Sequence, residues 1–192
     1  MEEWIRIFNE QHEPVGRATR DEAHAKGLWH ETFHCWLYDE NDVILQKRSE
    51  QKAGYPNRYD VTAAGHLGEQ ETVHDGVREV KEELGISVST DALEPFRIIP
   101  DVVEREEWHD REFAHVFFKK GMYHTNDFTL QKEEVEGLYR IAREDWIALL
   151  RKECDKVSVR TLNHAFVEHV RLEDFATHSA SYWEACTHFF DK

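Results

Sequence analysis

Residues 61–86 read VTAAGHLGEQETVHDGVREVKEELGI, and this stretch decides the fold. It predicts the end of a strand, a tight loop that contains glycine, and a helix over residues 73–84. Thr72 is the expected N-cap of this helix, with Asp75 three residues later in a capping-box arrangement. Gly85 suits the left-handed position just past the C-terminus of a helix.

The predicted helix has two chemically different faces. Residues at helical spacing form its apolar stripe: Val73, Val77, Val80 and Leu84. A different face carries Glu79, Glu82 and Glu83. Like charges at this spacing repel each other by about a few tenths of a kcal/mol per pair. A solvated acidic helix tolerates this cost, and Arg78 and Lys81 partly relieve it. The functional alternative is a Mg²⁺ site, because Mg²⁺ joins one or two carboxylates to the phosphates of a substrate.

The order of residues in this helix resembles the distal half of the Nudix box. Residues 78–86, REVKEELGI, match the pattern Arg-Glu-aliphatic-any-Glu-Glu-any-Gly-aliphatic. Gly65, five residues and Glu71 match the proximal half, but six residues rather than seven separate Glu71 from Arg78. This departure affects the junction between loop and helix and the role of Glu71. The resemblance extends over most of residues 1–150.

The resemblance implies an α/β fold, a Nudix-type α/β/α sandwich with a mixed β-sheet and a catalytic loop-helix. It implies hydrolysis of a nucleoside diphosphate linked to another moiety, or of a related diphosphate, with Mg²⁺ or Mn²⁺ as cofactor. Glu79, Glu82 and Glu83 would hold the cation, and Arg78 would orient Glu82 or Glu71. The general base would be Glu82 or Glu83, or a glutamate outside the box, for which Glu112 and Glu134 are the candidates.

Other charged side chains are candidates for binding substrate phosphates. These are Lys47, Arg48 and Arg58, each of which could equally be an ordinary surface charge. We expect substrate selectivity to reside in two loops, residues 49–58 and 103–111, which no motif interprets.

A set of histidines and acids resembles the metal site of the type I isopentenyl diphosphate isomerases, a branch of the same superfamily. The set is His24, His30, His66, Asp110 and Glu112. The alternative is that the histidines only make hydrogen bonds. The isomerases need a cysteine before the Gly-His pair, where this chain has Ala64, and a methyl group cannot transfer a proton. Isomerase activity is therefore the alternative reaction, and a non-catalytic Nudix-fold binding module is the alternative class.

Composition limits the compartment and the partners. The chain has 192 residues, a net charge of −15 and no basic run longer than two residues, so we expect no nucleic-acid-binding surface, which would need clustered Lys and Arg. No apolar run approaches the roughly 20 residues of a membrane span. The three cysteines lack metal-ligand spacing and are expected to be free thiols in the cytoplasm. We expect a small-molecule diphosphate as partner, no nucleic acid and no membrane, and leave a homodimer open.

We expect one Nudix domain over residues 1–192, with N-terminal extension strands at 1–30, a core at 31–153 and a C-terminal helical addition at 154–192. The strands are predicted at 4–8, near Val15, and at 31–38, 43–49, 60–65, 96–103, 112–119 and 137–142. Of these, 31–38 and 43–49 are expected to form a hairpin. The remaining helices are predicted at 21–26, 143–153 and 182–190.

Overall fold

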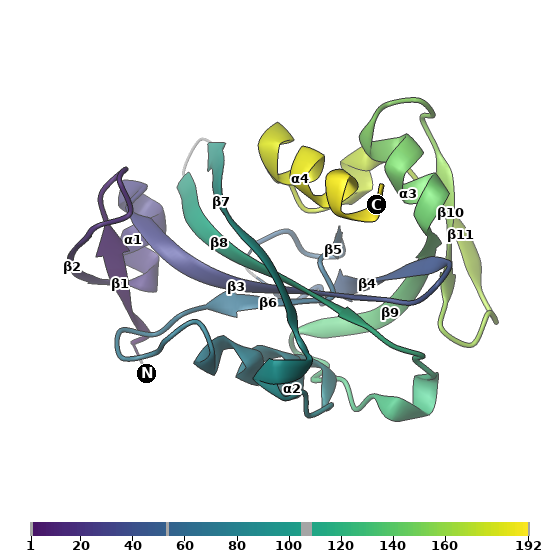
Figure 1. Ribbon diagram of the computed structural model, residues 1–192, viewed down its shortest axis with the longest axis horizontal. Coiled ribbons are helices and arrows are strands. Elements are labelled where there is room, and N and C mark those ends of the chain that lie inside the picture. The colour runs from purple at the N-terminus through teal and green to yellow at the C-terminus, as the bar shows by residue number, and fades with distance from the viewer. Residues whose placement is uncertain (1, 53, 105–108, 192) are drawn as a thin grey trace.

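Two long strands form the centre of the fold (Figure 1). They are β3 (Trp29–Tyr38) and β8 (His109–Lys120). The two strands run parallel, in a register that begins with His30 opposite Glu112 and ends with Tyr38 opposite Lys120. The computed structural model describes residues 2–52, 54–104 and 109–191.

The other strands extend this pair into one mixed sheet with the order β11-β10-β9-β4-β3-β1-β2. The N-terminal half of the chain contributes β1 (Trp4–Phe8), β2 (Pro14–Thr19), β4 (Asp42–Arg48), β5 (Tyr59–Asp60) and β6 (Ala63–His66). Later parts of the chain contribute β7 (Glu94–Glu104), β9 (Val135–Ala142), β10 (Val157–Thr161) and β11 (Val167–Val170). Off the main path, β5 pairs with β4, β6 with β3, and β7 with β8. The predicted mixed sheet is confirmed.

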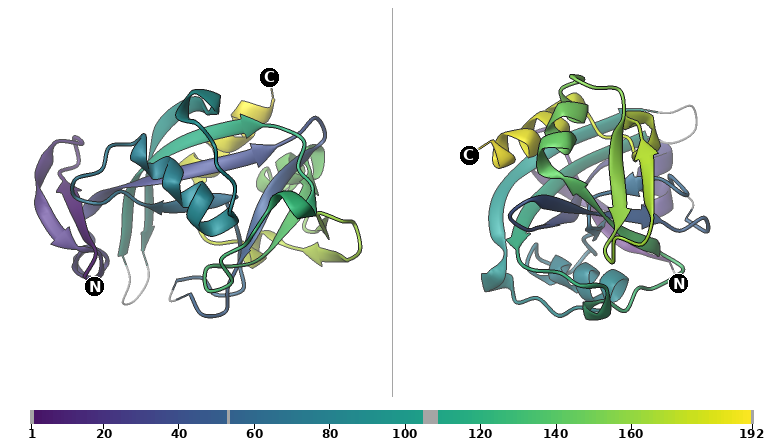
Figure 2. Two further views of the ribbon diagram at one scale, coloured as in Figure 1. Left: turned by 90° about the horizontal axis from the view of Figure 1, so that it is seen from below. Right: turned by 90° about the vertical axis from the view of Figure 1, so that its right-hand side faces the viewer.

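Helices cover both faces of this sheet (Figures 1 and 2). The α-helices are α1 (Arg20–Lys26), α2 (Arg78–Leu84), α3 (Arg143–Leu150) and α4 (Ala180–Phe190). The short 3₁₀ turns are η1 (Asp75–Val77), η2 (Thr90–Ala92), η3 (Thr125–Asp127) and η4 (Leu172–Asp174). Helix α2 lies on one side, and α3 and α4 lie on the other, so the predicted α/β/α sandwich is confirmed.

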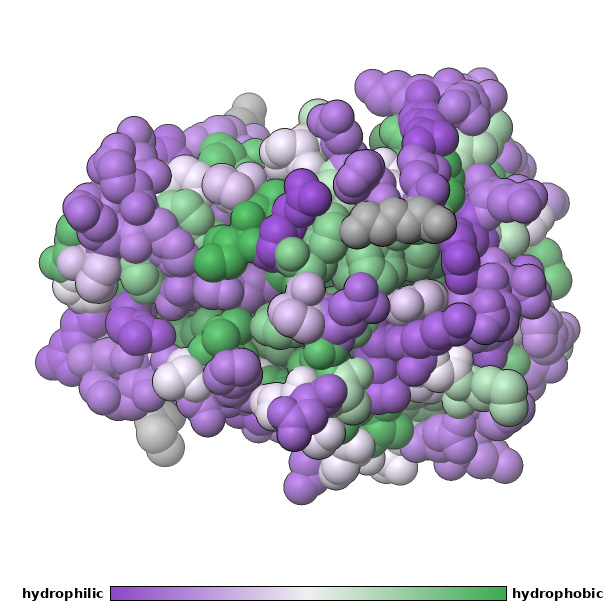
Figure 3. All heavy atoms as spheres, in the orientation of Figure 1, coloured by the Kyte–Doolittle hydropathy of each residue, from purple (hydrophilic) through white to green (hydrophobic). Residues whose placement is uncertain are grey.

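A separate apolar core fills the space on each side of the sheet. Beneath α3 and α4, Trp36 of β3 packs in one cluster with Trp146 and Tyr182. Beneath α2, Phe33 of β3 packs in a second cluster with Val80 and Leu84. The two cores use alternate residues of β3 because successive side chains of a strand point to opposite faces. The outer face seen in Figure 3 is mainly hydrophilic, with hydrophobic side chains gathered near its middle.

The acidic helix begins later than predicted. The α-helical part covers residues 78–84 and follows the 3₁₀ turn η1. Thr72 is not its N-cap, because the hydroxyl of Thr72 donates to the carboxylate of Asp75 instead of accepting a helix N–H. The other end agrees with the sequence, since Gly85 has a left-handed φ of 76° and its N–H bonds to Lys81 O at 2.9 Å.

Two further expectations need correction. The C-terminal region 154–192 is not only helical, since β10 and β11 form an antiparallel hairpin ahead of α4. The alternation of buried Val157 and Val159 is the strand signal in this region. The predicted hairpin of β3 and β4 is paired only at its tip, Tyr38 with Val43, because β4 diverges to pair with β9.

The packing of Gly76 predicts a stability effect. A Cβ at this position would lie 2.6 Å from Cβ of Phe33 and 2.9 Å from Cδ2 of Leu67, whereas nothing lies within 4 Å of a Cβ at Gly54. We expect Gly76→Ala to cost about 1–3 kcal/mol of stability through overpacking, which thermal unfolding would record as a Tm several degrees lower. Gly54→Ala is the matched control, and equal Tm values for the two variants would contradict the packing described.

Candidate active site

A polar cavity of about 300 Å³ lies between α2, the β3–β8 pair and the C-terminal segment. Its lining combines carboxylates, histidines and cations from distant parts of the chain. The lining includes His24, Thr32, His34, Arg48, Lys52, Gly65, His66, Arg78, Glu79, Glu82, Glu83, Asp101, Asp110, Glu112, Glu134 and His178. The fold thus brings the acidic helix, the histidine set and both outer glutamates to one place.

Two glutamates of α2 are held in surroundings that oppose their ionisation. Glu83 is 4% exposed, and burial, together with the neighbouring Glu79, raises its pKa to about 8 even though Lys52 lowers it. Burial and the neighbouring Glu82 likewise raise the pKa of Glu79 to about 7, although Arg78 lowers it. Each unit of such a shift is about 1.4 kcal/mol of free energy that opposes the charged form. A divalent cation among these oxygens would favour the ionised forms.

Gly65 makes room for Glu79. A Cβ at Gly65 would lie 2.1 Å from the carboxyl carbon of Glu79, so any side chain here would displace that carboxylate. The neighbouring Ala64 donates its backbone N–H to Oε2 of Glu83 at 3.3 Å. Strand β6 therefore leaves space for the carboxylate of Glu79 and donates a hydrogen bond to that of Glu83.

Arg78 connects the acids around the loop and the helix. Its Nε and Nη2 donate to the two carboxylate oxygens of Glu71 at 2.5 and 2.9 Å. Its Nη1 donates to Glu79 at 2.5 Å and to Glu82 at 3.1 Å. Glu82 is the most open of the three, with a side chain that is 53% exposed. The shortened spacing between Glu71 and Arg78 therefore leaves their ion pair intact.

The histidine set comes together at one end of β3. His24 comes from α1, His30 from β3 and His66 from β6. The Nε2 atoms of His24 and His66 are 3.0 Å apart, and one ring nitrogen from each of the three histidines lies within 4.8 Å of the others. Burial lowers the pKa of His24 to about 4 and also lowers the pKa of His30 and of His66. The rings are therefore neutral at pH 7, as metal ligands require.

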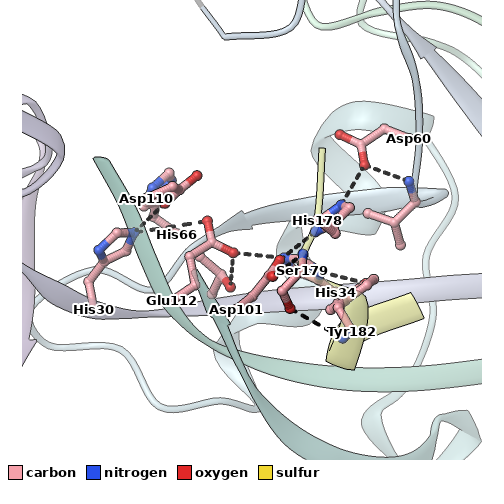
Figure 4. Close-up of polar contacts among 12 residues, drawn as sticks. His30, His34, Asp60, His66, Asp101, Asp110, Glu112, His178, Ser179 and Tyr182 are labelled. Carbon is pink, nitrogen blue, oxygen red and sulfur yellow. Dashed lines mark hydrogen bonds and ion pairs between the residues drawn. The ribbon is translucent and has the colours of Figure 1, made fainter. Parts of the chain in front are cut away.

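Two acids of β8 complete this set (Figure 4). Oδ1 of Asp110 lies 3.5 Å from Nδ1 of His24 and 3.6 Å from Nε2 of His30. Oε1 of Glu112 lies 3.9 Å from Nε2 of His30. These distances are too long for hydrogen bonds. Among the described residues, His30 Nε2 and Asp110 Oδ1 are both buried without a hydrogen-bond partner, which is an uncommon and costly arrangement for polar atoms.

A chain of polar contacts connects Glu112 to α4 (Figure 4). Thr32 donates to Oε2 of Glu112 at 3.0 Å, and Nε2 of His34 lies 3.4 Å from the same oxygen. On its other side, Nδ1 of His34 is 2.8 Å from the hydroxyl of Tyr182. Nε1 of Trp36 also donates to that hydroxyl, at 3.2 Å. The position of Glu112 therefore depends on the C-terminal helix.

A second buried group beside Tyr182 is a histidine held between two acids. Nδ1 of His178 is 2.6 Å from Asp101, and its Nε2 is 3.3 Å from Asp60. Burial alone would lower the pKa of His178, but Asp101 and Asp60 raise it to about 10. His178 is therefore a fixed cation in the cavity wall. No motif in the sequence points to it, because its partners come from β5 and β7.

The predicted phosphate-binding cations divide into two groups. Arg48 lines the cavity, where it donates to Asp60 at 2.8 Å. Lys47 does not line it and instead lies 3.1 Å from Glu168, because neighbouring residues of β4 point to opposite faces. Arg58 does not line it either, since its guanidinium bonds to the backbone oxygen of Glu173. Lys47 and Arg58 therefore lie outside the lining of this cavity, and their role in substrate binding stays a prediction.

The two expected selectivity loops also differ from each other. Lys52, Gly54 and Tyr55 of the first loop line the cavity. In the second, residues 103–104 end β7 and 109–111 begin β8, so these residues are strand. Residues 53 and 105–108 lie outside the described residues. Lys52 forms an ion pair with Glu134, which with Glu112 is one of the two candidate bases outside the box.

Comparisons with known proteins place this chain in a family. The model of the NUDIX domain matches residues 28–160. An uncharacterised Nudix hydrolase of Clostridium acetobutylicum is 35% identical over 199 residues, covering 95% of this chain and 94% of the relative. An isopentenyl-diphosphate Delta-isomerase of Aliivibrio fischeri is 38% identical over 92 residues, covering 45% of this chain and 51% of the isomerase.

The fold comparison agrees with the sequence comparison. A crystal structure of a protein from Deinococcus radiodurans superposes with a TM-score of 0.59 at 22% identity, covering 78% of this chain and 90% of that one. The MutT protein of Methanosarcina mazei gives 0.55 at 18% identity, covering 85% and 93%. At these identities the likeness shows the fold alone. With the NUDIX match and the relative that spans nearly its whole length, the chain belongs to the Nudix hydrolase family.

Proposed function

We propose that this chain is a diphosphohydrolase, dependent on Mg²⁺ or Mn²⁺, that cleaves a nucleoside diphosphate linked to another moiety or a related diphosphate. The observation that carries the proposal is the pair Glu79 and Glu83, buried together in a polar cavity with raised pKa values. Buried carboxylates are costly where their hydrogen-bond partners do not offset burial, and oxygen ligands in a cavity suit a hard cation. Glu82, at the exposed end of the set, would complete the ligands.

The residues of the cavity divide the work of hydrolysis. When bound by Glu79, Glu82 and Glu83, the cation would polarise the phosphate oxygens and lower the pKa of the attacking water. Arg78 orients Glu71, Glu79 and Glu82 through its hydrogen bonds. Glu82, Glu83 or Glu112 accepts the proton from water, and Glu112 is held for this by Thr32 and His34. The side chains of Arg48 and Lys52 line the cavity and would bind the substrate phosphates.

A second cation site is proposed at the histidine set. Its ligands would be His24, His30, His66, Asp110 and Glu112. The buried atoms His30 Nε2 and Asp110 Oδ1, which lack hydrogen bonds among the described residues, favour this role. Imidazole nitrogens suit a transition metal better than Mg²⁺. The two sites would share one cavity, so an ion at the second site would act on the same substrate.

The proposal extends to partners and compartment. The net charge of −15 argues against nucleic acid as a partner, and an anionic diphosphate would rely on the bound cation for its attraction. Among the described residues, no helix is long and apolar enough to cross a membrane. Cys35, Cys154 and Cys186 are free thiols, which supports a cytoplasmic location. A homodimer stays a prediction.

The substrate is the first measurement. A screen of nucleotide sugars, dinucleoside polyphosphates, ADP-ribose, NADH, nucleoside triphosphates and prenyl diphosphates, each with Mg²⁺ and with Mn²⁺, covers the proposed class. Absence of hydrolysis across the whole panel would favour the binding-module alternative, which the retention of Glu79, Glu82 and Glu83 argues against.

Neutralising Glu82 or Glu83 should lower activity without lowering stability. We expect Glu82→Gln and Glu83→Gln each to lower the hydrolysis rate by about a hundredfold or more, since the cation's contribution to the transition state is several kcal/mol. Without metal, the Tm should hold or rise, because burial already opposes the charge of Glu83 and Glu82 is half exposed beside two other carboxyl groups. Glu153→Gln, an exposed site away from the cavity, is the control. Wild-type rates in both variants under saturating Mg²⁺ would refute the catalytic role of α2.

Crowding Glu79 from β6, the strand that contains Gly65, should also lower the hydrolysis rate. Gly65→Ala places a methyl group where the Glu79 carboxyl lies, so we expect a loss of activity comparable with that of Glu79→Gln. Gly54→Ala changes the same residue type elsewhere in the cavity wall, with open space around it, and should retain activity. Steady-state hydrolysis of the substrate from the screen checks this. A fully active Gly65→Ala enzyme would show that Glu79 need not occupy its present position.

The isomerase alternative predicts a different reaction at the same cavity. We expect no interconversion of isopentenyl and dimethylallyl diphosphate, because Ala64 lines the cavity and its methyl group cannot transfer a proton. We expect Ala64→Cys to remain inactive, because the surrounding glutamates suit hydrolysis. Product analysis by chromatography, with an active isomerase assayed in parallel, measures this. Turnover by the wild-type protein would establish isomerase activity instead.

A further inference from the structure

A second group of histidine and carboxylate side chains lies on the other face of the β3–β8 pair. Glu31 of β3 and His115 of β8 point to the face that also carries Phe33, away from the cavity residues Thr32 and Glu112. His12, in the turn between β1 and β2, completes the group. None of its three members lines the cavity.

The three side chains converge on one carboxylate oxygen. Oε1 of Glu31 is 2.9 Å from Nε2 of His12 and 2.8 Å from Nε2 of His115. One potential ligand atom from each residue lies within 4.8 Å of the other two. The side chain of His12 is 27% exposed, and those of Glu31 and His115 are each 12% exposed. The group is therefore ordered yet reachable from solvent.

The surrounding structure holds His12 in place. Its ring stacks on Phe113 with centroids 4.1 Å apart, and Phe113 stacks on Trp29 at 4.5 Å. The turn itself is fixed by Asn9, whose side-chain oxygen accepts from the N–H groups of Gln11 and Glu13. His12 has a left-handed φ of 63°, which is uncommon outside glycine and tends to accompany function.

These distances fit a shared metal ion. Ligands about 2.1 Å from one ion lie about 3.0–3.4 Å apart in octahedral or tetrahedral geometry. Small outward shifts of the two rings would therefore suffice, with the proton of each neutral ring carried on Nδ1 instead of Nε2. Two imidazoles and one carboxylate form an open ligand set for transition metals, with positions left for water. Nη2 of Arg6 lies 3.4 Å from Oε2 of Glu31. Its charge opposes a cation, so we expect weaker binding than at a closed structural site.

We propose that His12, Glu31 and His115 bind a divalent transition-metal ion of the Zn²⁺ type, at a site separate from the cavity. The ion would join the β1–β2 turn to β3 and β8 and so brace the N-terminal hairpin that leads into α1. This proposal is independent of the proposed hydrolase activity, because its test measures binding alone.

Zn²⁺ binding to the full-length protein, freed of metal by a chelator, tests the proposal. Isothermal titration should give one more Zn²⁺ per wild-type chain than per His12→Asn chain. Asparagine suits the left-handed backbone of His12 but lacks the imidazole. Loss of a ligand should weaken this site by more than the roughly 10–100-fold that loss of an outer-shell partner costs. The histidine set of the cavity is unchanged in both proteins, so the difference isolates the new site.

Two further variants sharpen the result. Glu31→Gln keeps an acceptor oxygen but removes the charge, and it should also bind one Zn²⁺ fewer. His188→Asn removes an exposed histidine from α4 and should bind as the wild type does. Zn²⁺ should raise the Tm of the wild type more than that of His12→Asn. Equal stoichiometry and equal Tm increases in the wild type and His12→Asn would overturn the proposal and identify the group as a hydrogen-bonded cluster only.

Discussion

The parallel register of β3 and β8 is the constraint on which the rest of the structure depends. It sets His30 opposite Glu112. Through strand alternation it directs Thr32 and His34 to the cavity and His30 to the buried histidine set beside it, while Phe33 enters the core beneath α2. A slip of one residue would exchange the two sets, placing polar groups in that core and Phe33 in the cavity. Because such a slip is costly on both faces, the same pairing specifies the fold and the chemistry.

The cavity contains two kinds of buried acid, and their difference is physical. Asp60 has Arg48 and His178 beside it, and these partners lower its pKa to about 2 despite burial. Glu79 and Glu83 lack equivalent compensation, so burial prevails and raises their pKa values. The charge of an acid of the first kind is already balanced by cationic side chains of the protein, which gives that acid a structural role. Acids of the second kind gain most from an added cation.

The sequence sufficed for features that local pattern determines. The ordered box located α2, Gly85 and the contacts of Arg78, and alternation located most strands. Features that depend on tertiary contacts could not be predicted from local sequence patterns. The sequence could not show that Lys47 turns toward Glu168, nor that His178 reaches Asp60 and Asp101 from a C-terminal segment without a motif. Local spacing predicts Thr72 as a cap, whereas the chain tightens into a 3₁₀ turn where Gly76 packs against Phe33.

The position of Tyr182 has a consequence for how the protein is made. One wall of the cavity, residues 176–178, and the helix that binds His34 both follow the rest of the cavity lining in sequence. Synthesis runs from the N-terminus, and a domain generally folds as a unit. Until residues 176–190 have been synthesised, the buried faces of Trp36 and Trp146 lack their contacts with α4. The nascent chain therefore carries the complete box long before it has a finished cavity, and assembly of the site waits for these residues.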